Sequence, residues 1–313
     1  MPKFPEPIHL PTNVYEARAK RHEQIVGGAK WGIKIRLAII LFEVIGFIFT
    51  NSSTLFMEVV ASMLDVISTV FLIICIQLAR KPPDKDHPFG HGRYEPLGGL
   101  LLGALLCVMG ATLLIQQLMG TIQEEHVGYI NYLAWIFPAI AVVLLEICYR
   151  YVIRTAKNEN SPALAADAYH YRIDALTSLL ATMTLIIAAF LPHWSLLIDH
   201  IGAIFINLLM IGIGLYAASE NFHQLMDKIP DEVFFKTVKE AAEKVSGVLD
   251  TEKILIQLYG PDAHVDIDIE VDPQLTVDLA HKISQKVRTE IQKDWPAVRD
   301  VTVHIEPYYP NDH

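Results

Sequence analysis

The sequence has few cysteines and few charged residues for its length. Cysteine occurs 3 times in 313 residues, and charged residues make up 19% of the chain. Cys75, Cys107 and Cys148 form no CxxC pair, which argues against a disulfide framework and a cysteine-based zinc motif. All three lie in apolar stretches, so we expect them to pack as small buried side chains.

Charge is missing above all from long apolar blocks. The chain is 52% hydrophobic and its mean hydropathy is positive, which is more apolar than a typical soluble domain. The blocks are close to the length of about 20 residues that a helix needs to cross a bilayer. They predict six membrane-spanning helices, at residues 33–50, 55–78, 97–119, 129–149, 169–191 and 196–218.

Lysine and arginine are also missing from alternate loops. The loops 51–54, 120–128 and 192–194 contain neither residue, whereas the N-terminal segment and the loops after the second and fourth blocks contain several. By the positive-inside rule, both termini are expected to be cytoplasmic. Residues 1–32 lack the features of a cleaved signal peptide, so we expect the first span to stay as an anchor, in the inner membrane of a bacterium.

The C-terminal part of the chain has the patterns of a second domain. Acidic residues outnumber basic ones there and contribute to the net charge of −10, which argues against nucleic acid as a partner. Apolar spacing and alternation predict an α-β-β-α-β order, which gives an α+β domain with helices packed on one sheet face. The domains are thus a cytosolic N-terminal segment (1–32), a six-helix transmembrane transport domain (33–218) and a cytosolic C-terminal domain (219–313). The expected elements lie at 233–245, 253–259, 264–271, 276–293 and 301–305.

Ionisable residues inside two apolar blocks point to the chemistry. Asp65 lies in the second block, and His170 and Asp174 lie at the start of the fifth. Such residues are costly in a membrane helix and usually functional. His170 and Asp174 are four residues apart and share one helix face. An imidazole and a carboxylate on one face, with a second carboxylate on a neighbouring helix, indicate a divalent-metal site.

The loop after the second block carries a denser motif. Its sequence, Asp84-Lys-Asp-His87-Pro-Phe-Gly-His91-Gly-Arg-Tyr-Glu95, is followed by a glycine-rich third block. With six spans, the His-x-x-x-Asp pattern and the C-terminal α-β-β-α-β domain, the chain resembles the cation diffusion facilitator family. The resemblance implies a homodimeric metal/proton antiporter whose C-terminal domain has a metallochaperone-like fold. It also implies a transport site between the second and fifth spans.

The resemblance is incomplete at that transport site. The family normally has two ligands, four residues apart, in each of these spans, but Ala61 stands at the first position of the second span. Asp65, His170 and Asp174 remain as three protein ligands. Three interpretations stay open: water fills the fourth position, Glu58 assists from about two turns away, or transport is weakened.

The resemblance implies further metal sites outside the spans. Asp84, His87 and His91 match the family's loop site. The matched positions of the C-terminal domain, expected at the dimer contact, are Glu252, Asp268, His281, His304 and Glu306.

Structural roles also follow from the resemblance. Arg93 and Asp227 match a pair that joins the membrane and cytosolic domains, so we predict an ion pair that acts as a hinge. Gly99 and Gly103 permit close helix approach, which suits the dimer contact that the family makes near the third span.

The function expected from the sequence is export of a divalent metal ion from the cytosol in exchange for protons. Zinc is the first expectation, and manganese, iron, cobalt and cadmium stay open because ligand type alone does not rank them. The alternative is a non-transporting member that acts as a metal sensor or scaffold, which Ala61 favours. We expect no enzymatic activity, because a metallohydrolase with these ligands would lack a group that activates a nucleophile.

Overall fold

The chain divides into two compact units. The computed structural model describes residues 12–50, 53–119, 135–190 and 192–310. Residues 24–223 form one unit, called here the membrane unit. Residues 1–23 and 224–313 form the other, called here the C-terminal unit.

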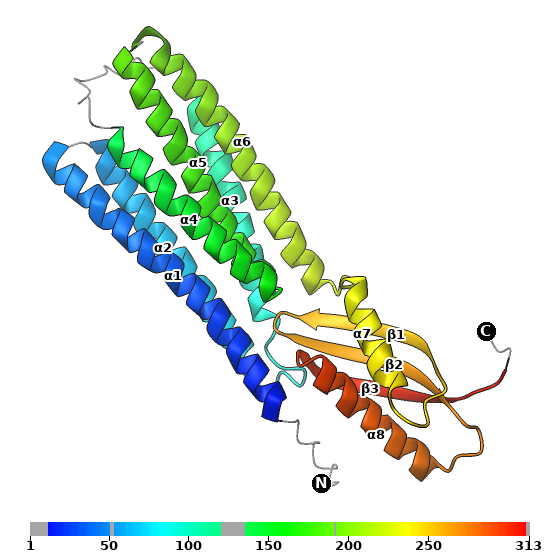
Figure 1. Cartoon of the computed structure of the whole chain (residues 1–313). Coiled ribbons are helices and arrows are strands. Elements are labelled where there is room, and N and C mark those ends of the chain that lie inside the picture. Colours follow the sequence, from blue (N-terminus) through cyan, green and yellow to red (C-terminus); the bar gives the residue numbers. More distant parts are fainter. Residues whose placement is uncertain (1–11, 51–52, 120–134, 191, 311–313) are drawn as a thin grey trace. The chain divides into compact units, whose positions relative to one another are not determined.

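Long helices build the membrane unit, and each block expected to span the membrane falls on one of them (Figure 1). Counting only residues that the structure describes, α3 and α4 are the two helices long and apolar enough to cross a membrane. That six helices do so remains a prediction. The helices are α1 (Thr12–Thr50), α2 (Ser53–Ala79), α3 (Tyr94–Met119), α4 (Ile136–Asn158), α5 (Pro162–Phe190) and α6 (Pro192–Leu225).

Several helices extend beyond the apolar blocks that predicted them. α5 begins seven residues before the expected start at 169, because Pro162 occupies its first position and the Ser161 hydroxyl accepts a hydrogen bond from the Leu164 amide at 3.3 Å. α1 begins at Thr12, inside the segment expected to precede the first span. α4 continues through a charged stretch to Asn158, and the first residues of its expected span, 129–134, lie outside the described part.

Glycines of α3 allow close packing against α6. A Cβ atom on Gly103 would lie 2.6 Å from the backbone nitrogen of Ala218, and one on Gly99 would lie 2.2 Å from Oδ1 of Asn221. This glycine pair, expected at a dimer contact, therefore packs against another helix of the same chain.

The C-terminal unit has the predicted α-β-β-α-β order. β1 and β2 are antiparallel, β2 and β3 are parallel, and the sheet order is β1-β2-β3. A crossover through α8 joins the two parallel strands, as parallel pairing requires. The elements are α7 (Glu232–Glu243), β1 (Asp250–Tyr259), β2 (Asp262–Val271), α8 (Val277–Asp294) and β3 (Val298–Pro307).

The side chains of β2 alternate between an apolar face and a polar face of the sheet. Val265, Ile267 and Ile269 are fully buried in a cluster with side chains of α7 and α8. The residues between them, Asp266 and Asp268, point to the opposite face, because successive strand residues alternate. The strict alternation in the sequence predicted this division.

The first turns of α1 are part of the C-terminal unit, and Arg18 contacts other residues of that unit. Nε of Arg18 donates a hydrogen bond to the carbonyl oxygen of Pro296 at 3.0 Å, and its Nη1 lies 4.0 Å from Oδ1 of Asp262. The buried Asp262 carboxylate also pairs with Arg299 at 2.8 Å.

Candidate metal centres

Helices α2 and α5 bring together the three residues expected to form the transport site. Nε2 of His170 lies 3.0 Å from Oδ1 of Asp65 and 3.8 Å from Oδ1 of Asp174. One ligand atom from each residue lies within 4.8 Å of the other two. Asp65 and His170 are buried and Asp174 is half-buried. These three residues could therefore hold one divalent ion between them.

An arginine that the sequence analysis did not single out contacts the same carboxylates. Arg36 of α1 forms ion pairs with Oδ2 of Asp65 at 2.7 Å and with Oδ2 of Asp174 at 2.5 Å. Its guanidinium lies over the Tyr171 ring, 5.0 Å from the centroid. A charged residue inside an apolar block was the available signal, the same one that identified Asp65.

Further polar side chains lie one turn from the cluster. The Thr69 hydroxyl donates a hydrogen bond to Oδ1 of Asp167 at 2.8 Å and lies 3.4 Å from the hydroxyl of Tyr171. Asp167 is only 2% exposed. Asp167 thus adds a further buried carboxyl group beside the cluster, held by the Thr69 hydroxyl.

A cavity of about 320 Å³ reaches the cluster from one side. Arg36, Asp65 and Asp174 line it together with Glu43 and Ser62, and the Ser62 hydroxyl donates to the Glu43 carboxylate at 3.1 Å. The cavity gives the three-residue site room for an ion and its water ligands. The side chains of Glu58 and Ala61 lie outside the described residues.

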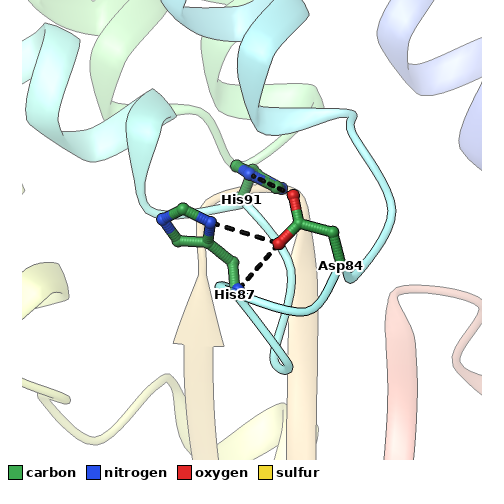
Figure 2. Close-up of side chains that lie close together, drawn as sticks. All are labelled: Asp84, His87 and His91. Atoms are coloured by element: carbon green, nitrogen blue, oxygen red, sulfur yellow. Dashed lines mark hydrogen bonds and ion pairs between the residues drawn. The ribbon is translucent and has the colours of Figure 1, made fainter.

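The loop between α2 and α3 forms a second cluster (Figure 2). Oδ1 of Asp84 accepts hydrogen bonds from the amides of His87, at 2.8 Å, and Asp86, at 3.0 Å. Nδ1 of His87 lies 3.3 Å from Oδ1 of Asp84, and Nε2 of His91 lies 3.4 Å from its Oδ2. The turn is completed by Gly90, whose φ of 87° favours glycine.

Hydrogen bonds favour the ionised form of the Asp84 carboxyl group, which is the form that binds a cation. The hydrogen bond from the His87 amide, followed by those from Asp86 and the His87 ring, lowers the pKa of Asp84 below its ordinary value. The buried Nδ1 of His91 has no hydrogen-bond partner among the described residues. A carboxylate and two imidazoles therefore converge in the loop, and their role in metal binding stays a prediction.

The polar face of the C-terminal sheet holds a third cluster. Asp268 is paired with His304 in the β2–β3 register, and Nδ1 of His304 lies 3.7 Å from Oδ1 of Asp268 and 3.2 Å from Oε1 of Glu306. These residues satisfy the spacing for one metal ion. Glu252 joins them through a side-chain hydrogen bond with Glu306.

His281 is not part of this cluster within one chain. It lies on α8, which packs against the apolar face of the sheet, whereas Asp268 points to the other face. Its predicted role in metal binding, like the Arg93–Asp227 pair between the two units, stays a prediction.

Comparisons with known proteins match both units. The family model described as "Cation efflux transmembrane domain" matches residues 31–226, and the one described as "Cation efflux protein, cytoplasmic domain" matches residues 230–308.

The similar proteins span most of the chain. The manganese efflux system proteins MneP and MneS of Bacillus subtilis are 28% and 30% identical to it. The alignments cover 83% and 84% of this chain and 88% and 89% of theirs. The magnetosome protein MamB of Paramagnetospirillum magneticum is 27% identical, over 88% of this chain and 92% of its own.

Proposed function

The chain belongs to the cation efflux family, the cation diffusion facilitators, and we propose that it exports a divalent transition-metal ion from the cytosol in exchange for protons. It is an integral membrane protein of the transporter class, and the proposal makes it a carrier rather than an enzyme. The observation that carries the proposal is the assembly of Asp65, His170 and Asp174 from α2 and α5 inside the matched transmembrane domain.

The charge of these residues supplies a transport mechanism. The carboxylates of Asp65 and Asp174 offset the charge of a divalent ion, which could not otherwise enter an apolar region. His170 must be neutral to coordinate the ion through Nε2. Protonation of the imidazole and of a carboxylate weakens metal binding and leaves a proton-loaded carrier to return. Metal export is thereby coupled to proton entry.

We propose zinc or manganese as the cargo. Three protein ligands that include an imidazole, with an open position, suit zinc. Carboxylate oxygen outnumbers imidazole nitrogen in the site, which suits manganese, and two similar proteins bear names of manganese efflux systems.

We also propose the remaining features of the family arrangement. α1 to α6 each cross the inner membrane of a bacterium, both termini lie in the cytoplasm, and two chains associate through their C-terminal units as a homodimer. The clusters at Asp84 and at Asp268 then bind metal on the cytosolic side, before or beside transport. The match to the family's cytoplasmic domain supports this arrangement.

The test is metal flux in liposomes that contain the purified protein and hold an imposed pH gradient. We expect flux of zinc or manganese, with iron(II), cobalt and cadmium completing the panel, and loss of that flux in Asp65→Ala. Glu146→Gln is the matched control, because it removes a carboxylate of the same unit that pairs with Arg150 and Arg172 rather than with the cluster. Flux that survives in Asp65→Ala contradicts the proposed path.

A non-transporting metal sensor or scaffold is the second candidate. It is favoured by Ala61, which replaces a family ligand, and by Arg36, which occupies both carboxylates of the site. A folded wild-type protein that binds metal but moves no metal of the panel would support this candidate against export.

A further inference from the structure

We propose that Arg36 is an internal counter-cation of the transport site, which competes with the metal ion for Asp65 and Asp174 and is displaced when the ion binds. This inference rests on the proposed function, because it assigns the ion to those two carboxylates. It adds a residue of α1 to a site built by α2 and α5, and it gives that residue a role in releasing the cargo.

The contacts place the guanidinium on both ligands at once. Its two terminal nitrogens lie 2.7 Å from Oδ2 of Asp65 and 2.5 Å from Oδ2 of Asp174. The other oxygen of each carboxylate is the one nearer to His170. An arginine keeps its charge at any pH of the cell. The two carboxylates are therefore bridged by a cationic side chain of the protein itself.

Counting charges shows why the two cations exclude each other. With Arg36 in place, the two carboxylates and the guanidinium carry one net negative charge, and a divalent ion would turn this into one net positive charge. With Arg36 moved away, the ion and the carboxylates are neutral together. Because an uncompensated charge in a buried site is costly, and two cations on shared carboxylates repel each other, metal binding favours departure of the guanidinium.

The surroundings of Arg36 allow that departure. Its Nε–H is buried and has no hydrogen-bond partner among the described residues, so the guanidinium is only partly satisfied. The cavity of about 320 Å³ beside it is lined by Glu43, Ser62 and Thr177 as well as by Arg36 itself. The cavity wall is mainly apolar, but it offers the Glu43 carboxylate and hydroxyl groups to a displaced cationic side chain.

An orienting role for Arg36 predicts the opposite effect on affinity. A group that merely holds the ligands in position strengthens metal binding, and its removal weakens the site. A competing cation weakens metal binding, and its removal strengthens the site. The sign of the change in Kd therefore separates the two roles.

The first experiment measures Kd for Mn²⁺ and Zn²⁺ by calorimetry on full-length protein in detergent. The background carries His91→Ala and His304→Ala, so that the other two clusters do not dominate the signal. We expect Arg36→Gln to bind about tenfold or more tightly, and Arg36→Lys, which keeps the charge, to stay close to the parent. Arg172→Gln is the matched control, because it removes an arginine of the same unit that pairs with Glu146, and it should leave Kd unchanged.

A second measurement needs no change at Arg36. Phenylglyoxal modification of Arg36, followed by mass spectrometry, should become faster when Mn²⁺ or Zn²⁺ is added to the parent protein, because the guanidinium leaves its two carboxylates. A rate that is unchanged or lower with metal overturns the proposal, even where Arg36→Gln does not fold.

The outcomes separate this inference from the proposed function. Metal binding that is lost in Asp65→Ala but is equal or weaker in Arg36→Gln overturns the role of Arg36 and leaves export standing. Absence of any binding that depends on Asp65, in the parent and in Arg36→Gln alike, overturns both. Tighter binding in Arg36→Gln with faster modification in the presence of metal supports both.

Discussion

The carboxyl group of Glu306 lies among groups that resist its ionisation. A hydrogen bond with Glu252 raises the pKa of Glu306 above its ordinary value, and the negative charges of Glu252 and Asp268 act in the same direction, against the opposing effect of His304. A proton on the Glu306 carboxyl group must leave before a metal ion can bind there.

Metal binding at the C-terminal cluster should therefore depend on pH through Glu306. Because the pKa of Glu306 is raised, the stabilisation from its protonated form is present below the ordinary glutamate pKa and is lost as the pH rises through the raised value. Affinity for metal should rise over the same interval. We expect Glu252→Gln, whose amide can donate to Glu306, to shift this rise to lower pH, as measured by calorimetry on full-length protein that carries Asp65→Ala and His91→Ala.

The control for this prediction is Glu243→Gln, which removes an exposed carboxylate that pairs with Lys239 in the same unit. It should leave the pH profile in place. A profile that is identical in wild type, Glu252→Gln and the control would show that Glu306 does not bind the metal.

Single residues of the proposed transport site could be predicted from the sequence only in part. Asp65, His170 and Asp174 stand out because ionisable groups are rare inside apolar blocks. Arg36 carries the same signal but lies four positions into the expected span 33–50, where a long cationic side chain can also reach the membrane surface. Only the fold shows that its guanidinium points to the two carboxylates.

At the scale of elements, the contact between α3 and α6 depends on the absence of a side chain at Gly103. We expect Gly103→Ala to lower stability by about 1–3 kcal/mol, as overpacking does, because the new Cβ would lie 2.6 Å from the backbone nitrogen of Ala218. The measurement is the midpoint of thermal unfolding in detergent.

Gly212→Ala is the matched control for that change. It lies on α6, and a Cβ atom there would have no neighbour within 4 Å among the described residues. Alanine is favoured over glycine in a helix by about 1 kcal/mol, so this variant should unfold at the same temperature or slightly higher. Equal midpoints for the two alanine variants would show that α3 and α6 do not pack as described.

Helices and strands could be predicted from the sequence where the spacing of apolar residues is regular over a short stretch. The alternation around Ile267 predicted β2, and the order of the C-terminal elements is confirmed. α5 starts before the expected span because the Ser161-Pro162 start signal, rather than hydrophobicity, sets the beginning of the helix. The partner of Gly99 and Gly103 could not be known, because glycine spacing shows that a helix can be approached closely but does not show by which helix.

At the scale of the whole molecule, the first turns of α1 lie in the same unit as the C-terminal elements. Arg18, near the start of α1, bonds to Pro296 and lies beside Asp262. A hydrogen bond from a charged group contributes about 1.5–3 kcal/mol when well buried. The Arg18 side chain is 20% exposed, and Asp262 would still pair with Arg299 if Arg18 were replaced. We therefore expect the contribution of Arg18 to stability to lie in the lower part of that range or below it.

Arg18→Met should loosen the C-terminal unit without unfolding it. We expect the amide of Ala263, which bonds to the carbonyl of Ala297 at 2.8 Å, to exchange its hydrogen roughly fivefold faster, equivalent to about 1 kcal/mol. Hydrogen-exchange mass spectrometry on the full chain measures this. Lys282→Met, which removes an exposed pair with Asp278, is the control, and equal exchange in both variants would show that Arg18 adds nothing.

Among the residues that the structure describes, the three candidate metal clusters share one property: each consists of imidazole and carboxylate groups and includes no sulfur. Thiolate ligands are lost stepwise to sulfenic, sulfinic and sulfonic acids under peroxide, whereas carboxylates are inert to the same oxidants. Cys75 and Cys148 are buried and free, and neither is among these ligand groups. Metal handling by this chain should thus continue during oxidative stress, when sites built on cysteine release their ions.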